Sequence, residues 1–357
     1  HPSPKSARGF GVEHPDLQPT LRRPVVPGSV KWRIRSFEKA SLLALPSRVF
    51  GGCILSDISP SPVPDPLRQP YDFVLRVLAD VPTGPEVLSD RLRSLRPALT
   101  ELRRCYQANT VQVRYEDPAI ACAYLLAYIP HYIRQAVEAF QFADFFAYRP
   151  RALKVGFFCT GPSPESVALA HHLRTQAWRH DLEIHLFDDR PRTWDLVGEP
   201  LRRLGCSHHW PEDVQFVTHQ TDLGTPAGLQ RHLDVIGELD LAVFQNCLNE
   251  LATDGFRHST EVLVSVAERL REGATLIVSD LREYEGNQRI LSKAGLALGR
   301  LGPVTSRSAR FRTDPPGPTT DLGRYFFDIH QISDDRAWPR VNNKVAFLVL
   351  EREDGSK

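Results

Sequence analysis

The chain has 357 residues, of which 41% are hydrophobic and 24% are charged, so it has enough apolar material for one large domain or two smaller ones. Its 44 Lys and Arg nearly balance its 43 Asp and Glu, and a net charge of +1 gives no reason to expect a nucleic acid or an anionic membrane as partner. No apolar run approaches the length of a membrane span and no apolar signal region opens the chain, so we expect neither a transmembrane helix nor a secretory signal.

The six cysteines are scattered and form no Cys-x-x-Cys pair. Cys159 and Cys247 stand at the ends of apolar runs of the kind that form buried strands. We therefore expect free thiols in a reducing compartment, and a cytoplasmic protein, rather than a disulfide framework. The run Cys-Ser-His-His at 206–209 is not joined by a second cluster with ligand spacing, so no metal site is expected.

The N-terminal part of the chain reads as a flexible start followed by a mainly helical region. Residues 1–30 are rich in proline and glycine and lack hydrophobic periodicity, which predicts a flexible segment. Residues 31–145 form the predicted helical or lid region. After a proline-rich run at 59–70, helical spacing of apolar residues predicts helices over 71–78, 85–106 and 118–142.

Three tyrosines of the last predicted helix share one face, because Tyr124, Tyr128 and Tyr132 are four residues apart. This stripe is interpreted either as plain core packing or as a lid whose aromatic face covers a ligand. Pro130 lies within the same helix and is expected to kink or split it.

From residue 151 to 352 short apolar runs alternate with segments of helical periodicity, which predicts βαβ units and a mostly parallel sheet. The last two predicted strands, separated by a polar turn that contains Asn342 and Asn343, have no helix between them and should pair as an antiparallel hairpin at one edge. The seven predicted strands span residues 153–160, 182–187, 214–218, 239–245, 274–279, 324–332 and 344–351.

The first predicted strand ends in a tight turn that opens a helix. This geometry brings a ligand against bare backbone and a helix N-terminus, and small residues permit the close approach. The full G-x-G-x-x-G pattern is absent, and an ordinary turn between strand and helix is the alternative. The turn consists of Phe158, Cys159, Thr160, Gly161 and Pro162.

Polar residues follow the next three predicted strands, at the carboxyl edge where α/β sheets bind their ligands. An acidic side chain after the second strand can accept the hydroxyls of a ribose, and a polar side chain after the third can bond an adenine amino group. The candidates are Asp188 and Asp189 after the second strand, Thr221 and Asp222 after the third, and Asn246 and Cys247 after the fourth.

In their order and spacing these segments resemble the motifs of the class I S-adenosylmethionine (SAM)-dependent methyltransferase superfamily. The set comprises the turn with Gly161 and Glu165, then Asp188, then Thr-Asp-Leu at 221–223, then DLAVFQNCLNEL at 240–251 and EGATLIVSD at 272–280. The resemblance covers residues 151–352. It implies a Rossmann-like, mostly parallel seven-stranded sheet that ends in an antiparallel C-terminal hairpin, preceded here by the helical region.

The resemblance further implies SAM as cofactor. It places the Gly161 turn at the cofactor, Asp188 on the ribose, Asp222 near the adenine and Asn246 near the sulfonium, with Phe158, Cys159 and Thr160 along the methionine end. Pro162, Asp189, Thr221 and Cys247 complete the expected cofactor-binding set. The chain departs from the family where Thr160 and Ser163 stand at positions at which glycine is common.

The function expected on this basis is methyl transfer from SAM to an unidentified acceptor. Alignment of the acceptor with the methyl group is the main requirement, and an acidic nucleophile would also need a base, for which Glu250, His219 and Tyr128 are the candidates. A small molecule is favoured as acceptor. Residues 1–110 hold 16 basic and 10 acidic side chains, which leaves RNA open, and a protein acceptor is open as well. The alternatives are a non-catalytic binding or assembly protein with a degenerate methyltransferase fold, and a Rossmann-like enzyme that uses NAD or a nucleotide.

Overall fold

The structure is a computed structural model, and it describes residues 63–107, 113–143, 152–178, 181–209, 214–248, 250–251, 257–282, 285–328, 339 and 341–352. The predictions for residues 1–30 and for 31–62 lie outside the described residues. The described parts all belong to one structural unit.

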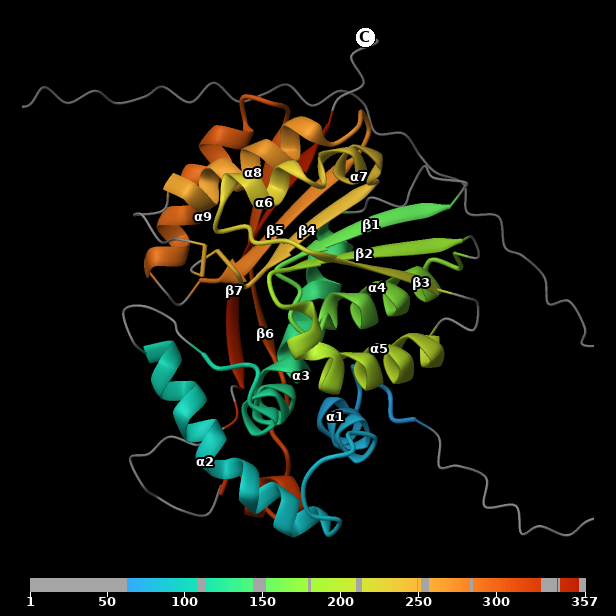
Figure 1. The fold of residues 1–357 in the computed structure, drawn as a ribbon, viewed down its shortest axis with the longest axis vertical. Coiled ribbons are helices and arrows are strands. Elements are labelled where there is room, and N and C mark those ends of the chain that lie inside the picture. The colour runs from blue at the N-terminus through green and yellow to red at the C-terminus, as the bar shows by residue number, and fades with distance from the viewer. Residues whose placement is uncertain are drawn as a thin grey trace, which may run out of the picture. The chain divides into compact units, whose positions relative to one another are not determined.

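Helices and strands alternate along most of this unit (Figure 1). The helices are α1 (Pro70–Ala79), α2 (Leu88–Gln107), α3 (Pro118–Ala143), α4 (Pro164–Thr175), α5 (Asp195–His209), α6 (Pro226–Gln230), α7 (Leu233–Glu238), α8 (Arg257–Arg269) and α9 (Glu285–Leu298), with short turns η1 (Pro191–Trp194) and η2 (Leu322–Phe326). The strands are β1 (Leu153–Phe158), β2 (Leu182–Asp188), β3 (Val214–Gln220), β4 (Leu241–Gln245), β5 (Thr275–Leu281), β6 (Val304–Arg312) and β7 (Asn342–Glu351).

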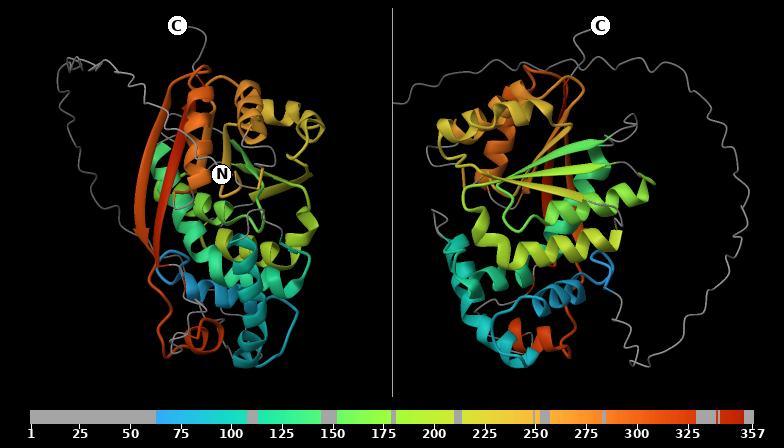
Figure 2. Two further views of the ribbon diagram at one scale, coloured as in Figure 1. Left: turned by 90° about the vertical axis from the view of Figure 1, so that its left-hand side faces the viewer. Right: turned by 45° about the vertical axis from the view of Figure 1, so that its right-hand side comes forward.

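The seven strands form one sheet in the order β3-β2-β1-β4-β5-β7-β6. Neighbouring strands from β3 to β5 run parallel, while β7 pairs antiparallel with both β5 and β6. Figure 2 shows β6 and β7 running side by side along one edge of the sheet. The predicted fold, a mostly parallel seven-stranded sheet that ends in an antiparallel hairpin, is confirmed.

Helices cover both faces of the sheet, so the residues of β1, β4 and β5 are almost all buried. On one face α3 packs against α4, β5 and β7, and α4 packs against α5; this face holds the larger apolar core, which α1 and α2 extend. On the other face α7, α8 and α9 enclose a second core. In the described part of the chain no helix is long and apolar enough to cross a membrane.

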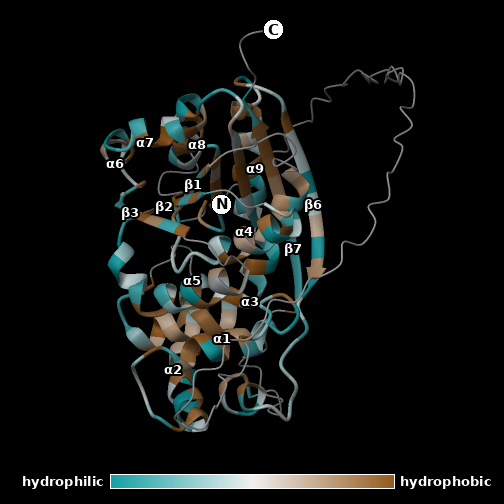
Figure 3. Cartoon of the chain, turned by 90° about the vertical axis from the view of Figure 1, so that its right-hand side faces the viewer, coloured by the Kyte–Doolittle hydropathy of each residue, from teal (hydrophilic) through white to brown (hydrophobic). Residues whose placement is uncertain are grey.

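The prediction of a strand at 324–332, as the first strand of the C-terminal hairpin, is wrong. The first strand of the hairpin is β6, at 304–312, an edge strand whose side chains are mostly exposed and which therefore lacks the apolar alternation that marks a strand (Figure 3). The apolar segment at 322–327 forms the turn η2, and Tyr71 packs edge-on against Phe327 with ring centroids 6.0 Å apart. Asn342 and Asn343, predicted in a polar turn, begin β7.

Pro130 does not split the helix, one of the two outcomes expected there, because α3 continues from Pro118 to Ala143. Most of its side chains are buried, since α3 is enclosed by α1, α2, α4 and the sheet. Packing on nearly all sides outweighs the one backbone hydrogen bond that a proline removes.

Candidate functional site

The register of the parallel strands brings their carboxyl ends to one level. Phe158 of β1 stands opposite Phe187 of β2 and Phe244 of β4. The three rings stack in a ladder, with Phe158 4.5 Å from Phe187 and 4.6 Å from Phe244 between centroids, and His219 of β3 extends the ladder at 4.6 Å from Phe187. The residues that follow these four positions therefore meet at one edge of the sheet.

The turn between β1 and α4 has an unusual backbone. Cys159, Gly161 and Ser163 all have positive φ, at 54°, 52° and 64°. Glycine adopts this conformation freely, whereas Cys and Ser do so at a cost of about 1 kcal/mol each. The conformation is held by a hydrogen bond from the Ser163 N–H to the Thr160 carbonyl at 2.8 Å and by a contact between the Ser163 and Ser166 hydroxyls.

Asp188, the last residue of β2, ties this turn to the sheet. Its Oδ2 accepts a hydrogen bond from the Gly161 N–H at 2.9 Å, and its Oδ1 accepts one from the Arg190 N–H at 3.0 Å. Burial raises the pKa of Asp188 to about 6, although the two hydrogen bonds act in the opposite direction. The remaining lone pairs of both carboxylate oxygens are available to a ligand.

The ends of β3 and β4 bring two further polar groups to the same edge. The Thr221 N–H donates to the Asp188 carbonyl at 2.7 Å, and the exposed Asp222 stabilises its own turn by accepting a hydrogen bond from the Gly224 N–H at 2.8 Å. Asn246, with φ 55°, exchanges two side-chain hydrogen bonds with Gln135 of α3.

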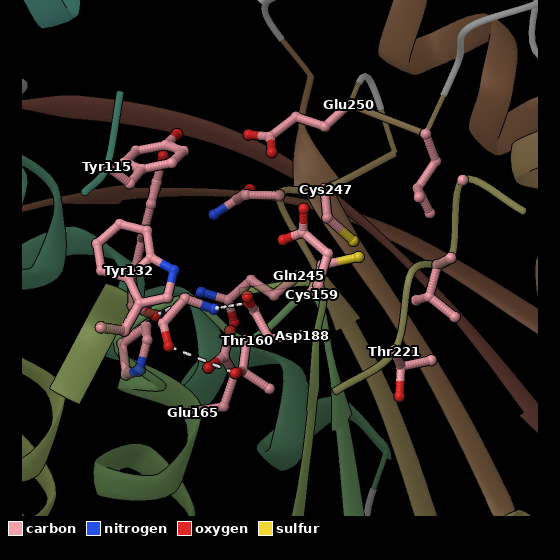
Figure 4. A pocket seen from close by; sticks show the side chains of 18 of the residues that line it. Tyr115, Tyr132, Cys159, Thr160, Glu165, Asp188, Thr221, Gln245, Cys247 and Glu250 are labelled. Carbon is pink, nitrogen blue, oxygen red and sulfur yellow. Dashed lines mark hydrogen bonds between the residues drawn. The ribbon is translucent and has the colours of Figure 1, made fainter. Parts of the chain in front are cut away.

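A pocket of about 320 Å³ lies at this edge of the sheet (Figure 4). Its floor comes from the ends of β1, β2 and β4 and its roof from α3, η1 and the segment before α3. It is lined by Tyr115, Tyr124, Tyr132, Cys159, Thr160, Gly161, Pro164, Glu165, Asp188, Asp189, Trp194, Thr221, Asp222, Leu223, Gly224, Gln245, Asn246, Cys247, Glu250 and Leu251.

Most of the residues that sequence reasoning selected meet in this pocket, and four do not. Phe158 and His219 belong to the aromatic ladder, on the face of the sheet that α7 and α8 cover. Pro162 is buried beside the pocket. Tyr128 packs behind the pocket, with its ring 5.2 Å from that of Tyr124 and 5.4 Å from that of Tyr106.

The thiols of Cys159 and Cys247 are free and lie next to each other on the floor (Figure 4). The pKa of both thiols is raised. For Cys247 the hydrogen bond from its partner and burial act together. For Cys159 the hydrogen bond to Cys247 lowers the pKa, but burial and the charges of nearby carboxylates together raise it by more. Both groups are therefore neutral, weakly polar surfaces at pH 7.

Several lining residues escaped sequence reasoning. Glu165, which opens α4, is part of the motif with Gly161 but is not among the predicted site residues, while Trp194 and Tyr115 come from short connecting segments without periodicity. The Trp194 ring lies over the Gly161 turn, at van der Waals distance from the position that a Cβ of Gly161 would take. Only the fold reveals that these side chains line the pocket, because no local pattern shows which way the segments after the strands turn.

The lining of the pocket carries acidic side chains and, among the described residues, no basic ones. Five of its lining side chains are carboxyls, namely Glu165, Asp188, Asp189, Asp222 and Glu250, and none of the described residues that line it is Lys, Arg or His. Burial raises the pKa of Glu165 to about 8. Desolvation and the nearby charge of Asp188 raise the pKa of Glu250 to about 7, although Glu250 keeps an exposed surface at the rim. Among the described residues, no group of three or more His, Cys, Asp and Glu could hold a metal ion.

Comparison with known proteins finds likeness of fold only. No family model matches the chain, and no curated protein matches it. The solved structures found include an O-methyltransferase family protein from Burkholderia thailandensis, with 14% identity, 77% of this chain and 75% of that chain covered, and a TM-score of 0.42. They also include the N-methyltransferase NodS from Bradyrhizobium japonicum WM9 in complex with S-adenosyl-L-homocysteine (8% identity, 72% and 99% covered, TM-score 0.37) and the precorrin 8w decarboxylase of Methanobacterium thermoautotrophicum (16% identity, 60% and 88% covered, TM-score 0.36).

The strand order decides the fold type, because β7 is inserted antiparallel between β5 and β6 at the end of a parallel sheet. This is the fold of the class I SAM-dependent methyltransferases. Within the methyltransferase fold, the pocket lies at the carboxyl edge of the sheet on both sides of β1, where the chain order reverses between β1 and β4 and where open α/β sheets bind their ligands.

Proposed function

We propose that the chain is a SAM-dependent methyltransferase. One observation carries the proposal: four successive strand ends bring the Gly161 turn, Asp188, Asp222 and Asn246 into a single pocket at the carboxyl edge of a methyltransferase-type sheet. The cavity of about 320 Å³ falls within the range of small-molecule sites.

The chemistry of the lining residues fits SAM. Asp188 keeps lone pairs that can accept hydrogen bonds from the two ribose hydroxyls. SAM carries a sulfonium and an ammonium group against one carboxylate, so its net positive charge is favoured by a pocket whose described lining has carboxyls but no basic side chain.

SAM supplies an electrophilic methyl group on a positively charged sulfur. In our proposal Asp188 holds the ribose, Thr221 and Asp222 border the adenine, and Asn246, oriented by Gln135, stands near the sulfonium. Cys159, Thr160 and Cys247 supply the surface along the methionine end, with Asp189 beside the ribose. The aromatic side chains from the helical region exclude water, which strengthens the electrostatic interactions that stabilise the transition state.

Glu250 is the base of this proposal, since of the three candidates it alone lines the pocket. A carboxyl with a pKa near 7 can accept a proton at neutral pH and release it again. His219 and Tyr128 lie outside the pocket, so neither is placed to act directly on an acceptor there. The helices α1, α2 and α3 form the proposed lid region, and residues 151–352 the proposed cofactor-binding domain.

Titration calorimetry with S-adenosylhomocysteine, the demethylated product, tests this function. We expect micromolar binding by the wild-type chain and at least a tenfold loss in Asp188→Asn, whose amide can still accept from the Gly161 N–H but lacks the second anionic oxygen for the ribose. Glu272→Gln, an exposed position in the turn before β5 at the opposite edge of the sheet, is the matched control. Absence of heat and of any thermal shift with millimolar SAM or S-adenosylhomocysteine would contradict the proposal and favour a non-catalytic role.

A further inference from the structure

The charge and the walls of the pocket indicate which acceptor it takes. Its roof is aromatic: Trp194 lies 4.6 Å from Tyr115 and 5.2 Å from Tyr124, and Tyr124 lies 6.1 Å from Tyr132, between ring centroids. The faces of such rings carry partial negative charge and attract cations. The same space is bounded by carboxyls and, within the described lining, by no basic side chain.

Two acceptor atoms inside the pocket indicate a missing donor. The Glu165 residue is 4% exposed and its Oε2 has no hydrogen-bond partner in the described part of the chain, and Gln245 is 6% exposed with Oε1 likewise unpartnered. Gln245 is fixed with this oxygen free, because its Nε2 donates to the Tyr132 carbonyl at 2.9 Å. Buried polar groups are rarely left unpaired, so a ligand that donates hydrogen bonds is expected here.

The third observation concerns the entrance of the pocket. Glu250 is exposed at the rim, and in Figure 4 its carboxylate extends from the rim toward Tyr115, while Glu165 lies at the far end of the pocket. A cation that enters therefore passes a carboxylate first and aromatic rings next. An anionic acceptor, such as a carboxylic acid or a nucleic-acid phosphate, meets the same carboxylates without a basic partner among the described lining residues and is repelled.

We propose that the methyl acceptor is an amine that binds as its ammonium ion between the aromatic roof and the carboxyls of Glu250 and Glu165. The inference rests on the methyltransferase function proposed above and names its substrate class. In the reaction the ammonium gives one proton to the Glu250 carboxylate, and the freed nitrogen lone pair forms the N–CH₃ bond. The C–S bond breaks with its electron pair remaining on sulfur, so that the sulfonium becomes a neutral thioether and the product is again an ammonium ion.

Three ligands that share a phenethyl group and differ in the charge of their head group test this inference: phenethylamine, 2-phenylethanol and 3-phenylpropanoate. Each is titrated by calorimetry into the chain saturated with S-adenosylhomocysteine, which already supplies the ammonium group of the cofactor, in about 150 mM NaCl to screen long-range attraction. We expect the cation to bind about tenfold more tightly than the alcohol, and the anion to give no measurable heat.

Two variants connect the selectivity to the site. Glu250→Gln, at the exposed rim, and Glu165→Gln, which keeps the shape of the buried side chain, should each reduce phenethylamine binding about tenfold and leave 2-phenylethanol binding within about twofold. Glu272→Gln should leave all three ligands unchanged. If circular dichroism shows that Glu165→Gln does not fold, Glu250→Gln alone still tests whether the carboxyls cause the preference for the cation.

The outcomes separate the two proposals. Binding of 3-phenylpropanoate as tight as that of phenethylamine, with S-adenosylhomocysteine still bound, would overturn the amine acceptor and leave the methyltransferase function intact. Charge-selective binding of phenethylamine without any S-adenosylhomocysteine binding would support the cation site and overturn the cofactor. An unchanged preference for the cation in Glu250→Gln and Glu165→Gln would likewise refute this assignment.

Discussion

The side chains of Gln135 and Asn246 hold each other in a reciprocal pair of hydrogen bonds. Gln135 Nε2 donates to Asn246 Oδ1 at 2.9 Å, and Asn246 Nδ2 donates to Gln135 Oε1 at 3.1 Å. Gln135 Nε2 also donates to the Ser279 hydroxyl at 2.7 Å. One fully buried glutamine of α3 thus fixes a pocket residue at the end of β4 and links it to β5.

Loss of this glutamine should destabilise the chain and weaken cofactor binding together. In Gln135→Leu the Asn246 amide and the Ser279 hydroxyl lose their partner, and we expect the free energy of unfolding to fall by about 2 kcal/mol or more. Urea unfolding followed by circular dichroism measures the change, and Gln230→Leu at the exposed end of α6 is the control. A Gln135→Leu chain within about 0.5 kcal/mol of the wild type would show that these bonds contribute little.

A single methyl group at Gly228 should disturb the turn that carries Asp222. A Cβ at this position of α6 would overlap the backbone carbonyl of Asp222, so the turn must move. We expect Gly228→Ala to destabilise the chain by about 1–3 kcal/mol and to weaken S-adenosylhomocysteine binding, the two effects being measured by thermal shift and by calorimetry.

A second glycine provides a control of opposite sign. In the middle of α9, a Cβ at Gly295 would make only ordinary contacts with Leu348, at 3.6 Å or more. Because alanine favours a helix, Gly295→Ala should raise stability by up to about 1 kcal/mol. Equal effects of the two substitutions would contradict the crowding ascribed to the Asp222 turn.

The buried carboxyl of Glu165 should make stability depend on pH. Its pKa is raised by burial from 4.5 to about 8, so folding disfavours the ionised form. The contribution of Glu165 to the free energy of unfolding is therefore fully present below pH 4.5, and it is lost as pH rises toward 8. Relative to the wild type, Glu165→Gln should gain stability across this range, with a difference in the free energy of unfolding on the order of a few kcal/mol at about pH 8 in the absence of ligand, and its melting temperature should rise accordingly.

Melting curves of both chains at about pH 5, 6.5 and 8 measure this gain. The exposed Glu268→Gln on α8 is the matched control for loss of a carboxyl. A difference between Glu165→Gln and the wild type that stays constant with pH would refute the neutral, buried state of Glu165.

His219 should make the chain sensitive to acid. Burial and the neighbouring His185 and His232 lower the pKa of His219 from 6.5 to about 4. Its Nε2 lies 2.9 Å from His185 Nδ1, so a second positive charge is unfavourable there. The unfolded chain takes up the proton first, and stability should therefore fall as pH drops from 6.5 toward 4.

His219→Phe keeps a ring in the aromatic ladder and removes this titration. Its melting temperature should fall less steeply than that of the wild type between pH 6.5 and 4, whatever the offset at neutral pH. Parallel curves for the two chains would show that His219 is protonated as readily in the folded as in the unfolded state.

The sequence determined the sheet through local patterns. The apolar runs that became β1, β2, β4 and β5 are short and buried on both faces, and polar residues follow each of them. Together with the polar residues that follow β3, these local patterns assigned Gly161, Asp188, Asp222 and Asn246 to one edge of the sheet. The edge strand β6 was not predicted from the sequence, because most of its side chains are exposed to solvent and no apolar alternation marks it.

The tertiary structure alone decided what faces those strand ends. Gln135, Tyr115 and Trp194 carry no local signal for a pocket, and His219 and Phe158 turn to the opposite face because side chains alternate along a strand. Periodicity reports only which side of an element is apolar. Which distant residues meet there depends on how α3, α4 and η1 pack over the sheet, and this is settled by the fit of many side chains at once.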